Sequence, residues 1–189
     1  MTAIDTIPFA GGLHAAIYHD TDAGQPFAED EAVRIVVLHR RHIDPAAGGC
    51  GRDPDEVAAW QRENAVEWFT IQLFLYDHGS VAYAVGQTNP FHCPWDSGRV
   101  GIIALRRADW GNGQESDATL AAYAQSLADT YTEWANGECY GYVLYGPGGE
   151  ERDSCWGFIG FDAVREEAAA AADAHRQPGL FSGLLEQAR

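Results

Sequence analysis

Two short segments of this chain each combine a thiol, a carboxylate, a hydroxyl and an indole within a few residues. The first is Phe91-His92-Cys93-Pro94-Trp95-Asp96-Ser97-Gly98, and the second is Asp153-Ser154-Cys155-Trp156-Gly157-Phe158. Both lie beside stretches with the composition of β-strands, in which alternate side chains share one face. A thiol with a nearby histidine and carboxylate can support nucleophilic catalysis, so the first segment is a candidate active site.

A catalytic role for Cys93 requires a base and a group that orients this base. His92 is adjacent, but neighbouring side chains of an extended segment point to opposite faces. His78 is the better candidate base, because it lies at a turn and can approach from a neighbouring strand. Asp96 or Asp153 would orient the imidazole. Together these residues would form the site of a Cys/His-dependent hydrolase.

Two other interpretations use the same groups. In the first, Cys93 and Cys155 are buried core residues, as free cysteines commonly are, and the neighbouring Asp-Ser pairs form turns. In the second, three or four side chains of one set bind zinc in a metal-dependent hydrolase. The set is His78, His92, Cys93, Asp96, Asp153 and Cys155. Their spacing matches no recognised zinc motif, and the chain has no Cys-x-x-Cys pair. We therefore predict neither a metal site nor another cofactor.

The chain is strongly acidic. It has 28 Asp and Glu residues against 12 basic residues, all of them arginine, and a formal net charge of −16. Thirteen carboxylates lie between Asp109 and Asp173, where only Arg152 and Arg165 are basic. Such a field repels nucleic acids and membrane surfaces and attracts basic protein surfaces. We therefore expect no direct binding to nucleic acid or membranes and favour a basic protein that handles nucleic acid as the partner. Maintenance of solubility is the alternative role of the acidity.

The candidate partner-binding residues are acidic groups expected on exposed faces. They are Asp117, Asp129, Glu133, Glu150, Glu151, Glu166 and Glu167. Among the tryptophans, Trp110 precedes a glycine in a loop and is the indole most expected at the surface, where it would anchor an interface. Trp95 and Trp156 also lie close to glycines and are expected to pack over the backbone. The sequence indicates no oligomeric state.

The composition is that of a globular protein. With 189 residues, of which 46% are hydrophobic, the chain can form one domain with a buried core. No apolar run is long enough to cross a bilayer. The first residues, Met1 to Asp5, lack the basic start and apolar core of a signal peptide. We therefore expect a cytoplasmic protein whose four cysteines stay reduced.

Local patterns predict the elements that hold these groups. Asp53, Pro54 and Glu56 have the spacing of a helix start with a capping box, and Ser116 caps a helix that Gly137 ends. Strands are expected at 13–18, 34–40, 67–76, 81–85, 100–105, 139–145 and 155–161, and helices at 53–64, 116–137 and from 162 onward. Since hairpins outnumber strand–helix–strand crossovers, we predict a single α+β domain, residues 1–189, with a largely antiparallel sheet and about three helices.

Three landmarks resemble those of a family of small proteins carried by phages, plasmids and other mobile elements. They are Tyr76-Asp77-His78-Gly79, Phe91-x-Cys93-Pro94-Trp95-Asp96-Ser97-Gly98-x-Val100-Gly101 and Asp153-Ser154-Cys155-Trp156-Gly157-Phe158. They occur in the family's order, whereas Gly79-Ser80 and His92 depart from its pattern. The resemblance implies no activity. It implies an accessory protein of a mobile element, and such proteins often act on host defence or replication.

Two functions follow from these observations. The favoured one is an acidic binding module, a DNA mimic that inhibits a nucleic-acid-binding protein of host defence, such as a restriction or CRISPR protein. The alternative is the Cys/His-dependent or metal-dependent hydrolase. The two differ in the feature on which they depend, because the first needs the exposed carboxylates and the second needs the Cys93 thiol.

Overall fold

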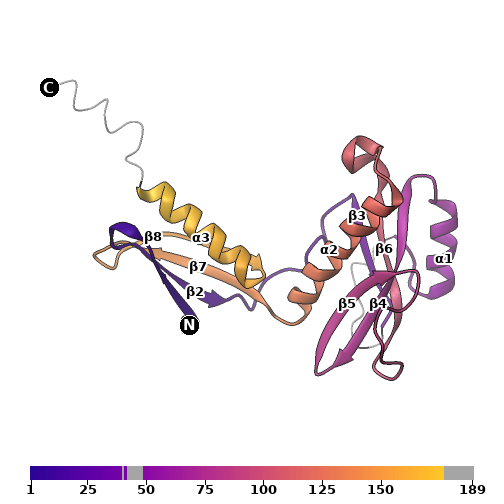
Figure 1. Ribbon diagram of the computed structural model, residues 1–189, viewed down its shortest axis with the longest axis horizontal. Helices are drawn as coiled ribbons and strands as arrows, with labels where there is room; N and C mark the ends of the chain where they lie inside the picture. Colours follow the sequence, from indigo (N-terminus) through magenta and orange to yellow (C-terminus); the bar gives the residue numbers. More distant parts are fainter. Residues whose placement is uncertain (40, 42–48, 177–189) are drawn as a thin grey trace. The chain divides into compact units, whose positions relative to one another are not determined.

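The computed structural model describes residues 1–39, 41 and 49–176. The chain divides into two compact units, a terminal unit (Met1–Gly24 with Gly137–Arg189) and a central unit (Gln25–Asn136). The described residues form three α-helices and two antiparallel four-stranded sheets (Figure 1). This confirms the predicted α+β class and its antiparallel pairing, although the strands form two sheets, one in each unit. The single domain stays a prediction.

The central unit has a sheet with the strand order β3-β6-β4-β5. The α-helices α1 and α2 lie on opposite sides of this sheet (Figure 1), and each has its own hydrophobic cluster. Because both faces are covered, the inner strands β4 and β6 are apolar along most of their length. The elements of this unit are β3 (Val33–Val37), α1 (Pro54–Glu63), β4 (Trp68–His78), β5 (Ser80–Gly86), β6 (Ser97–Arg106), two 3₁₀ helices (Arg107–Asp109 and Gly111–Gly113) and α2 (Asp117–Ala135).

Both predicted helix starts of the central unit are confirmed. The side chain of Asp53 accepts hydrogen bonds from the backbone N–H groups of Asp55 and Glu56, both at 2.9 Å. Ser116 Oγ accepts a hydrogen bond from the N–H of Thr119 at 3.2 Å. These caps satisfy amides that the first helical turn leaves without a partner. The predicted strand end at Arg40 lies outside the described residues.

Side chains of α2 protect the exposed edge of β5. An edge strand offers unpaired N–H groups that can pair with another chain. Here three of these N–H groups donate to side-chain oxygens of α2 and its cap, so the edge is already occupied. The bonds join Val81 to Asn136 Oδ1 (3.0 Å), Tyr83 to Thr132 Oγ1 (2.8 Å) and Val85 to Gln125 Oε1 (3.0 Å).

The terminal unit has a sheet with the order β1-β2-β7-β8, and α3 covers one of its faces (Figure 1). The helix buries the small side chains Val164, Ala168 and Ala172 against this face, so it can approach the strands closely. The elements are β1 (Asp5–Pro8), a 3₁₀ helix (Ala10–Gly12), β2 (His14–His19), β7 (Cys139–Tyr145), β8 (Glu151–Ile159) and α3 (Phe161–Arg176). The sequence did not predict β1, and β8 begins four residues earlier than expected.

Two buried groups have raised pKa values. Burial raises the pKa of the Cys50 thiol from 9.0 to about 11. Burial, aided by the negative charge of Asp153, raises the pKa of Tyr142 from 10.0 to about 12. At a pH between the ordinary and the raised pKa, each group is deprotonated in the unfolded chain but still protonated in the folded chain. The folded protein then binds more protons than the unfolded one, and stability falls as the pH rises.

We expect the midpoint of thermal unfolding to fall between about pH 9 and about pH 12 for this reason. The variant Tyr142→Phe should lose the part of this decrease that lies above about pH 10. The midpoint is measured by circular dichroism over a pH series, with Tyr123→Phe as the control, because Tyr123 is 37% exposed. A Tyr142→Phe profile that follows the wild type above pH 10 would contradict the prediction.

Candidate functional site

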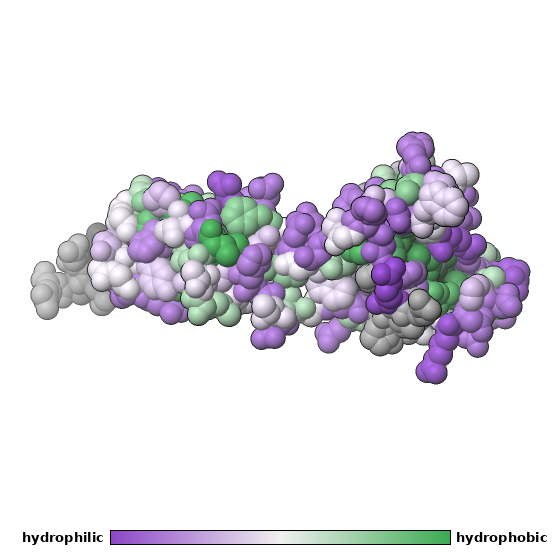
Figure 2. Space-filling model, turned by 90° about the horizontal axis from the view of Figure 1, so that it is seen from below, coloured by the Kyte–Doolittle hydropathy of each residue, from purple (hydrophilic) through white to green (hydrophobic). Residues whose placement is uncertain are grey.

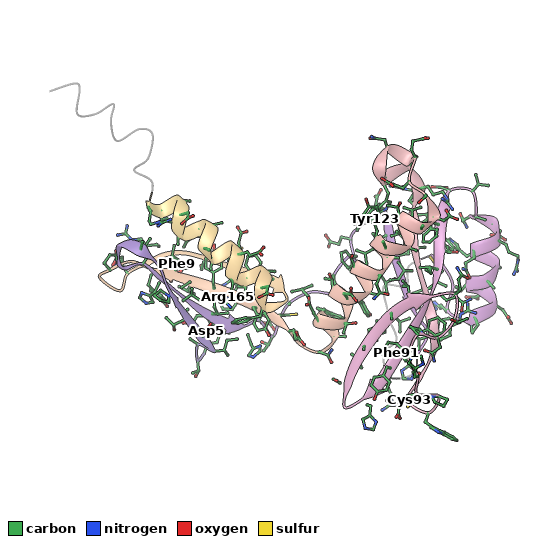
Figure 3. All side chains as sticks on the ribbon, viewed as in Figure 1. Asp5, Phe9, Phe91, Cys93, Tyr123 and Arg165 are labelled. Carbon is green, nitrogen blue, oxygen red and sulfur yellow. The ribbon has the colours of Figure 1, made fainter. Side chains whose placement is uncertain are left out.

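Cys93 lies in the loop between β5 and β6, near Phe91 (Figure 3). Polar groups fix the shape of this loop. Asn89 Oδ1 accepts a hydrogen bond from the N–H of Phe91, and Asn89 Nδ2 donates to Ser97 Oγ, both at 3.0 Å. The Ser97 hydroxyl in turn donates to the carbonyl of Cys93. The loop therefore presents the thiol from a defined backbone position.

The hairpin of β4 and β5 brings His78 to this loop. Gly79, with a φ of 86°, makes the turn directly after His78, and the N–H of Asp77 donates to the carbonyl of Asp96 at 2.8 Å. His78 Nδ1 lies 3.3 Å from Asp96 Oδ2, and Cys93 Sγ lies 3.3 Å from the same oxygen. Three of the four residues predicted for catalysis thus meet at one carboxylate.

The order of these groups differs from that of a catalytic triad. In a triad the imidazole lies between the nucleophile and the carboxylate. Here the carboxylate of Asp96 lies between the other two groups, and the Cys93 thiol donates to it. The side chains of His78 and Asp96 are 70% and 36% exposed. The Cys93–Asp96 hydrogen bond and the His78–Asp96 contact tie the loop to the hairpin, and in this order the His78 imidazole does not stand between the thiol and the carboxylate.

Asp153, the other candidate orienting carboxylate, belongs to β8 of the terminal unit. Its Oδ2 accepts a hydrogen bond from the hydroxyl of Tyr142 at 3.4 Å and lies 3.9 Å from His175 Nε2. Asp153 is thus part of a separate polar cluster. Across the described residues, no group of three or more His, Cys, Asp or Glu side chains is arranged to hold a metal ion.

The interpretation of Cys93 and Cys155 as buried core residues is wrong. Cys155 is exposed and Cys93 is half-buried, whereas Cys50 and Cys139 are buried. Cys155 lies on β8, an edge strand whose residues are mostly exposed. The segments around Cys93 and Cys155 therefore place their thiols where solvent can reach them.

The tryptophans differ from the expectation in two places. Trp95 is 92% exposed, so most of its ring faces solvent. Trp110 is half-buried, with its ring centroid 5.1 Å from that of Tyr123, because it packs against the core of the central unit. Trp156 packs over the backbone as expected, but over Gly141 of the neighbouring strand. Trp95, and not Trp110, is thus the strongly exposed indole of the two, and the binding role of Trp110 stays a prediction.

Several predicted partner-binding carboxylates already have partners within the chain. Asp117 pairs with Arg107 at 2.8 Å, and Asp129 Oδ1 accepts a hydrogen bond from Gln125 Nε2 at 2.7 Å. Two more of the predicted carboxylates also interact with other groups. They are Glu133, which is half-buried and has an interaction of its own, and Glu150, which pairs with Arg152.

Glu150 shows the effect of such pairing on a carboxyl group. A hydrogen bond from its own backbone N–H and the one from Arg152 lower the pKa of the Glu150 carboxyl. By contrast, Glu151, Glu166 and Glu167 are exposed. In the part of the chain that the structure describes, their carboxylates form no ion pair or hydrogen bond. Figure 2 shows strongly hydrophilic residues over much of the visible surface, in line with this composition.

The comparisons with known proteins supply no further constraint. No protein-family model matches the chain, and no curated protein or solved structure matches it either. The resemblance to proteins of mobile elements therefore stays a prediction. Within residues 1–39, 41 and 49–176, no helix has the length and apolar character needed to cross a membrane.

Proposed function

We propose that the chain is an acidic protein-binding module that occupies the basic, nucleic-acid-binding surface of another protein. The observation that carries the proposal is a set of exposed carboxylates on the terminal unit, Glu151, Glu166 and Glu167, for which the described residues supply no ion pair or hydrogen bond. This unit contains twelve acidic residues and four arginines, so it has a formal net charge of −8. A dense negative field of this kind attracts a surface that evolved to bind phosphates.

The absence of internal partners matters for the energetics of binding. A carboxylate that already pairs with arginine, as Asp117 does, must give up that interaction or share it when a partner arrives. Glu166 and Glu167 can form charge-assisted hydrogen bonds without such a loss. Long-range attraction also raises the association rate, which is the main effect of complementary charge at an interface. The same field makes nucleic acid itself an unfavourable ligand.

The resemblance to accessory proteins of mobile elements supports the class of partner. A DNA mimic of this kind would act in the bacterial cytoplasm on a restriction, CRISPR or other defence protein. Its acidic surface would exclude DNA from the partner by occupying the same site. The inhibitor needs no catalytic residue for this role.

We expect the tagged protein to retain a basic, nucleic-acid-binding protein from a bacterial lysate at about 50 mM salt and to release it at about 500 mM, because salt screens exposed charges. Duplex DNA should then compete with the chain for the isolated partner in a binding assay. A charge-matched acidic protein is the control for nonspecific capture. A partner that binds DNA and the chain simultaneously, or with affinity independent of salt, would contradict the proposal.

The hydrolase is the second candidate, favoured by the convergence of Cys93, His78 and Asp96. The variant Cys93→Ser separates the two functions. It should capture the same partner as the wild type if the acidic surface is responsible. Loss of all function in a folded Cys93→Ser protein would instead favour the hydrolase.

A further inference from the structure

The helix α3 covers only one face of the sheet of the terminal unit. The strands alternate, so that Ile17, Tyr142 and Leu144 lie against α3 and the residues between them lie on the other face. Among the described residues of this unit, no helix lies on that other face, which we call the open face. By strand register, it is formed by His14, Ala16 and Tyr18 of β2, Gly141, Val143 and Tyr145 of β7, and Ser154 and Trp156 of β8.

Aromatic rings make up much of the open face. Trp156 lies over Gly141, where an added Cβ would come within 2.2 Å of its ring, and its centroid is 6.0 Å from that of Tyr18. The neighbouring hydroxyl of Tyr18 raises the pKa of Tyr145. The ring of His14 stacks on Tyr145 with centroids 5.3 Å apart. Trp156 remains 42% exposed, so a ligand can reach its ring.

Carboxylates border these rings at both ends. Glu151 is paired with Tyr145 across β7 and β8, and its negative charge also acts on the Tyr145 hydroxyl. At the opposite end of β7, the N–H of Asp20 donates to the carbonyl of Cys139 at 2.8 Å. Glu138 directly precedes Cys139, and the charges of Asp20 and Glu138 add to burial in raising the pKa of the Cys139 thiol.

Rings flanked by carboxylates select a cationic ligand. Aromatic residues on an open sheet can stack on the bases of single-stranded nucleic acid, but the phosphates of such a ligand would meet a unit with a formal charge of −8. A guanidinium group binds well to both features. It stacks on the face of an aromatic ring and donates two parallel hydrogen bonds to a carboxylate.

We infer that the open face binds an arginine-bearing segment of the partner, with Trp156 as a stacking residue and Glu151, opposite Tyr145, among the carboxylates that border the face. The inference rests on the proposed function, which supplies the class of partner, a protein with a basic surface. It adds the face of this chain that makes the contact and the partner side chain that is recognised, arginine. Arginine should be preferred over lysine, since the ammonium group of lysine has no planar face to stack on an indole.

The test uses the full chain and a labelled peptide of eight arginines, with fluorescence anisotropy measured at about 150 mM salt. We expect Trp156→Ala to weaken binding about tenfold, and Trp156→Phe, which keeps a ring, to weaken it less. Trp95→Ala is the matched control, because Trp95 is the other strongly exposed tryptophan and belongs to the central unit. A peptide of eight lysines should bind more weakly than the arginine peptide.

Equal affinity of the wild type and Trp156→Ala for the arginine peptide would overturn the inference. So would an equal loss in Trp95→Ala, or tighter binding of a labelled oligothymidylate than of the peptide. None of these results would remove the acidic-module proposal, which depends on the salt-sensitive partner and its competition with DNA. Circular dichroism of each variant establishes that the terminal unit is folded.

Discussion

Alanine at Gly101 should strongly destabilise the central unit, whereas alanine at Gly98 of the same strand should be tolerated. Gly101 is buried on β6, where it pairs with Val37 of β3 and Leu73 of β4. A Cβ at this position would lie 1.7 Å from the carbonyl oxygen of Val36 and 2.8 Å from its carbonyl carbon. Both atoms belong to the backbone, so no side-chain rotation can relieve the overlap.

The cost of Gly101→Ala comes from the separation of β3 and β6. Inserting atoms into a packed core typically costs about 1–3 kcal/mol, and more where the backbone must move. We therefore expect a loss of about 3 kcal/mol or more in the free energy of unfolding, measured by urea denaturation. A Cβ at Gly98 has no atom within 4 Å, so Gly98→Ala should change stability by about 0.5 kcal/mol or less. Equal midpoints for the two variants would contradict this account.

The sequence predicted helix starts and turns well, because a capping residue or a glycine-rich turn acts locally. Asp53 and Ser116 accept hydrogen bonds from the first turns of their helices as expected, and Gly146 to Gly149 connect β7 and β8. The short strand β1 was missed because its four residues show little alternation between buried and exposed positions.

The pairing of the strands could not be predicted in the same way. Alternation shows that a segment is a strand but not which strand lies beside it. The strand β2 pairs with β7, more than a hundred residues later, and this pairing creates the sheet of the terminal unit. The open face could not be predicted from the sequence, because only this strand order brings Trp156 of β8 close to Tyr18 of β2, with β7 between them.

The candidate site shows the same limit. The sequence identified Cys93, His78 and Asp96 as a group, since a turn and a loop could bring them together. It did not predict their order, which depends on how the hairpin brings His78 to the same Asp96 oxygen that accepts from Cys93. Trp156 packs over a glycine of the neighbouring strand, so its nearest glycine in the sequence carried no information about its packing.

Reversing three exposed carboxylates of the terminal unit should have the largest effect on function. We expect Glu151→Lys, Glu166→Lys and Glu167→Lys combined to weaken binding to the isolated partner about tenfold to a hundredfold. Each exposed ion pair contributes about 0.2–1 kcal/mol, and each reversal also adds a repulsion. Most of the loss should appear in the association rate, measured with the partner immobilised on a sensor surface.

The matched control reverses Asp117, Asp129 and Glu133 of α2. Each reversal adds two charges, so both triple variants have a formal net charge of −10 in place of −16. Because the variants share one net charge, a difference between them reports the position of the charges. The α2 carboxylates already have internal partners, so their reversal should weaken binding less. Equal weakening by the two variants would mean that total charge governs association, and the terminal unit would lose its special role.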